Sequence, residues 1–143
     1  GKELTLAMYD QGADIVMNVA SGTGVGVLEA AAEAGLYAIG VDMNQDGDQP
    51  GHILTSMLKE NGTAVYEIIK AAQNGTFEGG TYMYLDLAYG GVDTTDMSTI
   101  KSTLSEENAA LLDELLAEIA DLKQQIASGE LVVSNYEGFG PQA

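Results

Sequence analysis

The first residues whose spacing could do chemistry form a glycine-rich turn. Positions 22, 24 and 26 are glycines between a short apolar run and an alanine-rich segment, and Asp42 ends the next apolar run. Glycines at such a turn let a phosphate approach a helix N-terminus, and the later acid holds a ribose. The dinucleotide-binding fingerprint is incomplete here, because its last glycine position holds Val27. A tight turn with packing glycines, or a helix N-terminus that binds another polar ligand, are the alternatives.

A second candidate is the loop after this strand, where acidic and amide side chains alternate in the pattern of half a calcium-binding loop. They are Asp42, Asn44, Asp46 and Asp48. The twelfth loop position is Ile53 rather than a bidentate Glu, and a predicted strand precedes the loop instead of a helix. A solvated acidic turn therefore explains the pattern better than a metal site, and calcium stays the weaker alternative.

The third candidate is Lys59, which follows the apolar run 53–58. Five lysines are the only cationic side chains besides His52, so a lysine in this place could face an anion, a ligand or Asp42. The other interpretation is a surface lysine ahead of the next helix.

Covalent and acid–base chemistry has little to use in this chain. There is no Cys, His52 is the single histidine, and no sequence pattern supplies a base for Ser21 or Ser56. We therefore expect neither an enzyme nor a bound cofactor.

The charge balance excludes further classes. Asp and Glu number 22 against 5 Lys, which gives a formal charge of −17. Nucleic-acid binding needs a basic face, and anionic membranes attract basic segments, so neither partner fits. No apolar run has the length of a membrane span, and the first residues lack signal-peptide character.

Hydrophobic patterning predicts alternating helices and strands that position these residues. Two apolar strands joined through a helix indicate a parallel βαβ unit with a buried sheet. The expected helices cover 2–11, 25–34 and 62–74, and the expected strands cover 13–19, 36–41, 53–58 and 81–87. Gly35 is expected to end the second helix.

A long final helix is expected to begin at Thr103 or Ser105, with Glu106 placed for a capping box with Thr103, and to end at Ser128-Gly129. A short strand-like run follows at 131–133. The helix carries a heptad seam that suits either a partner helix or, as we favour, packing on its own sheet. The seam consists of Leu112, Leu115, Ile119, Leu122 and Ile126.

In order along the chain, several segments closely resemble the basic membrane protein family, the substrate-binding lipoproteins of ABC importers that include purine nucleoside receptors. The matching segments are GADIV at 12–16, ASGTGVGVLEAA at 20–31, YAIGVD at 37–42, ILTSMLK at 53–59, AVY at 64–66, FEGG at 77–80, GGV at 90–92 and IASGE at 126–130.

The resemblance implies an α/β fold: a doubly wound, parallel-sheet lobe of a type I periplasmic-binding protein, with three α/β/α layers. Residues 1–143 would be one α/β unit, the carboxyl-terminal half of a two-lobed clamp and mainly its second lobe. Residues 62–74 and parts of 76–143 would return to the first lobe.

The resemblance also implies a site and partners. Ser21, Gly22, Thr23 and Gly24 would line the cleft, Asp42 would bind the sugar hydroxyls of a nucleoside, and Lys59 would stand beside it. Parallel-sheet ligands lie beyond the carboxyl ends of strands, where Ser21 and Asp42 fall. The full-length protein would be extracytoplasmic, lipid-anchored at the cell surface or in the periplasm, and would serve an ABC permease. Alone, this half would expose apolar surface or self-associate.

Overall fold

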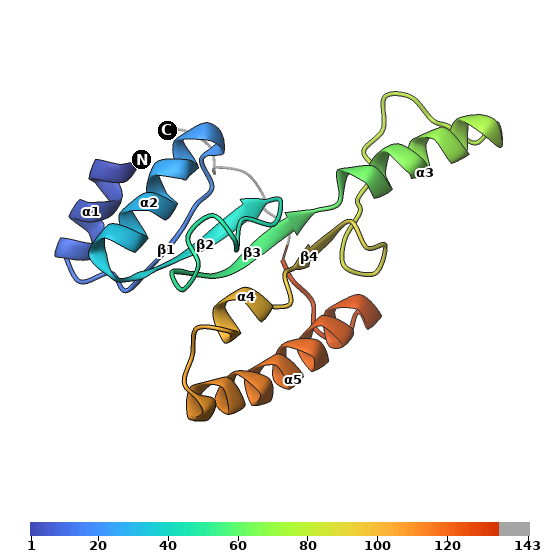
Figure 1. Ribbon diagram of the computed structural model, residues 1–143. Helices are drawn as coiled ribbons and strands as arrows, with labels where there is room; N and C mark the ends of the chain where they lie inside the picture. Colours follow the sequence, from blue (N-terminus) through green and yellow to red (C-terminus); the bar gives the residue numbers. More distant parts are fainter. Residues whose placement is uncertain (135–143) are drawn as a thin grey trace, which may run out of the picture.

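The structure is a computed structural model that describes residues 1–134 (Figure 1). Its elements follow one another in the order α1 (Lys2–Asp10), β1 (Ile15–Met17), a 3-10 turn η1 (Ser21–Thr23), α2 (Gly24–Ala34), β2 (Tyr37–Asp42), β3 (Ile53–Lys59), α3 (Asn61–Gln73), β4 (Val92–Thr94), α4 (Ser98–Lys101) and α5 (Glu106–Ser128). The α/β class and the βαβ unit predicted from the sequence are confirmed.

The strands form one sheet in the order β1-β2-β3-β4. The first three strands are parallel, as expected, but β4 runs antiparallel to β3. The chain leaves the sheet at the end of β3 and returns beside the same end, where the Glu60 N–H donates to the Gly91 carbonyl. A strand that re-enters at the end where its neighbour left must run the opposite way. The sheet is therefore mixed and not wholly parallel.

Two expected strands are wrong. Residues 81–87 and 131–133 are not in strands, and Tyr82 is 90% exposed. The alternation of Tyr82 and Tyr84 suggested a strand, but neither segment pairs with a strand of the sheet. A strand needs a neighbour for its backbone hydrogen bonds, and residue patterns do not reveal whether one is in reach.

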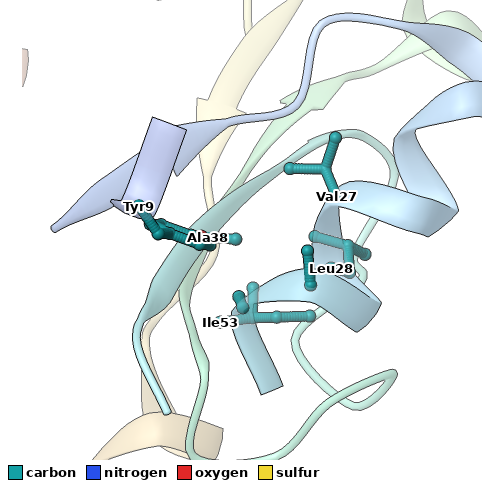
Figure 2. Packing of buried hydrophobic residues seen from close by; sticks show 7 residues of the cluster. Tyr9, Val27, Leu28, Ala38 and Ile53 are labelled. Atoms are coloured by element: carbon teal, nitrogen blue, oxygen red, sulfur yellow. The ribbon is translucent and has the colours of Figure 1, made fainter. Parts of the chain in front are cut away.

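Helices lie on both sides of the sheet, which gives three layers (Figure 1). The core sits between α1, α2 and the sheet, where small alanines let α2 approach closely (Figure 2). It contains Tyr9, Val27, Leu28, Ala30, Ala31, Ala38 and Ile53. The Tyr9 hydroxyl donates to the Tyr37 carbonyl at 2.7 Å, and burial raises the pKa of this phenol. Gly35 ends α2 in the left-handed conformation, as predicted.

On the other side, α5 packs beside β3 and β4. Ile119, Leu122 and Ile126 line an apolar groove with Met57 and Val92. Leu115 and Leu122 of the seam are about half exposed, so the choice between packing on the sheet and a partner helix stays a prediction. The packing is loose, because no residue of α5 is fully buried.

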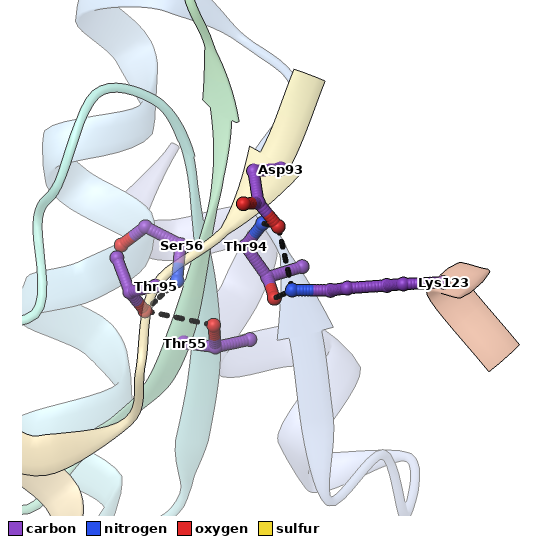
Figure 3. A network of polar contacts seen from close by, with 6 residues as sticks. All are labelled: Thr55, Ser56, Asp93, Thr94, Thr95 and Lys123. Atoms are coloured by element: carbon purple, nitrogen blue, oxygen red, sulfur yellow. Dashed lines mark hydrogen bonds and ion pairs between the residues drawn. The ribbon is translucent and has the colours of Figure 1, made fainter. Parts of the chain in front are cut away.

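A polar contact fixes α5 to β4 (Figure 3). The Lys123 ammonium donates to the Asp93 carboxylate at 2.5 Å and to the Thr94 hydroxyl at 2.8 Å. The first of these bonds lowers the pKa of the Asp93 carboxyl.

The start of α5 differs from the expected capping box. Ser105 is the N-cap, and its hydroxyl accepts from the Asn108 N–H at 3.3 Å. The Thr103 hydroxyl instead donates to the Ile100 carbonyl at 2.7 Å, so it belongs to the end of α4. The start at Thr103 and its capping box are therefore wrong, because Thr103 lies at the end of α4, and the start at Ser105 is confirmed.

Candidate ligand-binding site

The candidate residues lie at one edge of the sheet. The turn Ser21–Thr23 follows β1, Asp42 ends β2 and Lys59 ends β3. These three strands are parallel neighbours, so their carboxyl ends share an edge. Three loops thus leave the sheet at the edge where α/β sheets bind their ligands, and a shared site at this edge stays a prediction.

Asp42 has an unusual backbone. Its φ is +71°, and the N–H of Met43 donates to the carbonyl of Val41 at 2.9 Å, which closes a three-residue γ-turn around it. A γ-turn with positive φ is rare and strained, and positive φ is uncommon for any residue except glycine. Strain of this kind is held in place by the surrounding structure and gathers at functional sites.

The Asp42 carboxylate is paired with Lys59. The Lys59 ammonium lies 2.6 Å from Asp42 Oδ1, and both side chains are about half exposed. The Lys59 side chain therefore faces Asp42, and it is also half exposed as a surface lysine would be, so its role in a ligand site stays a prediction. Asp42 also keeps free acceptor capacity, because a carboxylate has about four lone-pair sites.

The glycine-rich turn combines packing with an open edge. A Cβ on Gly24 would lie 1.8 Å from Asn18 Oδ1, and one on Gly26 would lie 2.8 Å from the Lys2 backbone nitrogen, so both glycines permit close packing. Gly22 has open space around it, and Ser21 has a φ of +49°. Within residues 1–134, no hydrogen bond joins residues 21–24 to Asp42 or Lys59, so their shared role in a site stays a prediction.

The acidic loop does not gather its side chains around a cation. Asp46 is only 2% exposed and accepts from the Ser56 hydroxyl at 2.6 Å, while Asn44 Oδ1 accepts from the Asp46 N–H at 3.0 Å. In residues 1–134 no three His, Cys, Asp or Glu side chains form a group able to hold a metal. The other interpretation, a solvated acidic turn, is also wrong for Asp46, because its carboxylate is buried and bonded to Ser56.

Two residues at this edge were missed by the sequence analysis. Asn18 is 1% exposed and its Nδ2 donates to Gln45 Oε1 at 3.2 Å. The same oxygen accepts from the Val41 N–H at 2.9 Å. The available signal was a polar residue inside the apolar run 13–19, which indicates a buried hydrogen-bonded side chain.

The comparisons with known proteins decide the family. The model of PnrA-like ABC transporter substrate-binding proteins matches residues 1–137. The chain belongs to this family. The resemblance noted in the sequence is thereby confirmed, and the dinucleotide-binding and calcium-binding alternatives are not needed to explain the glycine-rich turn or the acidic loop.

Curated relatives in this family are longer than the chain. It is 32% identical to the ABC transporter nucleoside-binding protein BmpA of Lactococcus lactis over 93% of its own length and 39% of that protein. It is 30% identical to Basic membrane protein C of Borreliella burgdorferi, over 96% of the chain and 37% of that protein. The chain therefore spans about two fifths of the length of these relatives. Family relatives are substrate-binding proteins rather than enzymes.

Solved structures give the same architecture. An ABC transporter solute-binding protein from Aeropyrum pernix matches with a TM-score of 0.69 and 28% identity, over 96% of the chain and 44% of that protein. A protein from Bacillus halodurans, described as a transcriptional activator of the comK gene, matches with a TM-score of 0.75 and 24% identity, over 90% and 42%. The second match bears on the fold alone.

Proposed function

We propose that the protein is the substrate-binding component of an ABC importer and that its ligand is a nucleoside. The observation that carries the proposal is Asp42, a half-exposed carboxylate held in a strained turn at the carboxyl edge of the sheet, in a chain of this family. The named specificity of the Lactococcus lactis relative supports the choice of nucleosides. Binding is non-covalent, and no residue acts as a catalyst.

Each candidate residue has a physical role in this proposal. Asp42 accepts hydrogen bonds from two ribose hydroxyls, which suits the two oxygens of a carboxylate. Lys59 holds that carboxylate through its ion pair. The turn over Ser21–Gly24 offers hydroxyl and backbone N–H groups at the start of α2 to the polar atoms of the ligand. The opposite wall of the cleft comes from a second lobe, which closes on the ligand and signals to the permease.

Isothermal titration calorimetry of the full-length protein with adenosine, guanosine, inosine, cytidine and uridine tests the proposal. At least one of these nucleosides is expected to bind with a stoichiometry near one. Free ribose and free adenine serve as controls for the two halves of the ligand. Binding of another solute class, with no heat from any nucleoside, would sink the nucleoside assignment.

We further propose that α3 packs on this second lobe. The helix projects away from the sheet (Figure 1), and none of its residues is fully buried. Val65, Tyr66 and Ile69 are each more than half exposed although they form the apolar side of the helix. Without the lobe, the 143-residue chain is expected to self-associate through this surface. Light scattering that finds a monodisperse monomer, with no binding of a dye for apolar surface, would contradict this.

The cellular setting follows from the same proposal. An importer's binding protein works outside the cytoplasm, and we expect the full-length protein to be held there by a lipid anchor. Among the described helices, none has the length and apolarity needed to cross a membrane. Blocking the lipoprotein signal peptidase is expected to replace the mature, membrane-bound protein by its unprocessed precursor. Cell fractionation with and without the block, read by gel mobility, measures this change. An unchanged cytosolic protein would argue against the setting.

A further inference from the structure

A buried polar network lies directly beneath the candidate site. It starts at Asn18, whose Nδ2 donates to Gln45 Oε1. It continues from the Gln45 N–H to the Ser56 hydroxyl at 3.0 Å, and from that hydroxyl to Asp46 Oδ1 at 2.6 Å. The network thus connects the end of β1, the loop after β2 and the middle of β3.

Gln45 Oε1 takes the place of a backbone acceptor beyond the end of β1. The N–H of Tyr37 donates to Asp14 and the carbonyl of Ile39 accepts from Asn18, so alternate residues of β2 bond toward β1. Val41 is the next residue on that side, but β1 ends at Met17. Its N–H donates to Gln45 Oε1 instead. Val41 is 5% exposed, and a buried N–H without a partner would be costly.

The same oxygen also holds the glycine-rich turn. Asn18 packs against Gly24 so closely that a Cβ there would lie 1.8 Å from Asn18 Oδ1. That Oδ1 has no hydrogen-bond partner in the described part of the chain. The bond from Nδ2 to Gln45 is therefore the side-chain hydrogen bond that fixes the Asn18 amide under the turn.

Gly40 leaves the space beside β2 that the Gln45 side chain occupies. A Cβ on Gly40 would lie 2.5 Å from the Ser56 hydroxyl and 3.1 Å from Gln45 Oε1. Only a glycine at this position of β2 leaves room for both side chains. Gln45 Oε1 therefore accepts from Val41, the residue before Asp42, and from Asn18, which packs against Gly24.

We propose that Gln45 is a positioning residue of the ligand-binding site, which holds the strained turn of Asp42 and the turn over Ser21–Gly24 in one fixed arrangement through Val41 and Asn18. Gln45 does not contact the ligand in this account. The inference rests on the proposed function for its effect on affinity, and it has a structural consequence that is independent of any ligand.

Two substitutions of similar size separate the role of the oxygen from the role of the volume. Gln45→Met fills the space without an acceptor, whereas Gln45→Glu keeps an acceptor for both the Asn18 amide and the Val41 N–H. If losing both hydrogen bonds leaves the site ordered in about a tenth of the molecules, nucleoside affinity falls about tenfold in Gln45→Met, and most of that loss is recovered in Gln45→Glu. Calorimetry of the full-length protein with adenosine and inosine measures both variants.

Thr55→Val is the matched control. The Thr55 hydroxyl bonds to the Thr95 hydroxyl at 2.8 Å in a buried setting (Figure 3). Neither Gln45 nor Asn18 takes part in this bond. This variant is expected to lose thermal stability like Gln45→Met but to keep wild-type affinity. If affinity falls in proportion to stability in both variants, Gln45 has only a structural role and the proposal is wrong.

Hydrogen exchange gives the readout that needs no ligand. The Val41 amide is expected to exchange at least about tenfold faster in Gln45→Met than in wild type, and to be protected again in Gln45→Glu. If wild type binds no nucleoside, the proposed function fails and this exchange result alone decides the inference. An unchanged Val41 amide in Gln45→Met would overturn it.

Discussion

Asp42→Asn is expected to weaken nucleoside binding by about a hundredfold, since hydrogen bonds to a charged group contribute about 1.5–3 kcal/mol each and the amide offers one neutral acceptor oxygen. Asparagine tolerates positive φ, so the γ-turn at +71° is kept and the loss comes from the charge. The stability of the fold is expected to change by about 1 kcal/mol or less, because the pair with Lys59 is half exposed.

Asp48→Asn provides the control for this experiment. Asp48 is exposed in the same loop, so its substitution changes the net charge equally without touching the Lys59 pair. Calorimetric titration of both variants of the full-length protein gives the comparison. Equal affinities for Asp42→Asn and Asp48→Asn would show that Asp42 does not bind the ligand.

Gly24→Ala is expected to destabilise the chain by about 2–4 kcal/mol, as overpacking at a buried position does. Its new Cβ would lie 1.8 Å from Asn18 Oδ1 and 2.3 Å from Asn18 Cγ. Asn18 is 1% exposed and bonded to Gln45, so it has no room to move aside. Urea denaturation followed by circular dichroism measures the loss.

Two further variants locate the cause of that loss. Gly22→Ala lies in the same turn with nothing within 4 Å of its Cβ, and it is expected to change stability by about 0.5 kcal/mol or less. Adding Asn18→Ala to Gly24→Ala removes the obstructing amide and is expected to cost less than the sum of the two single changes. Additive losses would mean that the amide is not the obstacle.

Elements could be predicted from the sequence where local pattern and buried sheet geometry agree. The apolar strands 36–41 and 53–58 and the helix ended by Gly35 lie within about a residue of their observed bounds, and the placement of Ser21 and Asp42 beyond strand ends followed from them. The parallel pairing of β1 with β2 could be predicted because a helix joins these two strands. The parallel pairing of β2 with β3 lacks this signal, since a loop without a helix joins them.

The features that could not be predicted from the sequence depend on contacts between distant residues. The strand expected at 81–87 is wrong because a strand needs a paired neighbour, which residue pattern does not reveal. The strand β4 was missed because three residues carry little pattern. Gln45 looked like an ordinary loop residue, since its importance comes from Val41 and Asn18, which meet it only in the folded chain. The sequence pattern around Asp46 is that of a metal ligand, because the bond from the Ser56 hydroxyl to its carboxylate forms only in the folded chain.

A crystal structure of the full-length protein with a bound nucleoside tests the central claim most directly. The account predicts the ribose within hydrogen-bond distance of the Asp42 carboxylate, with Lys59 still paired to it and the turn over Ser21–Gly24 against the ligand. A nucleoside bound away from the carboxyl edge of β1, β2 and β3, with Asp42 open to solvent, would contradict it.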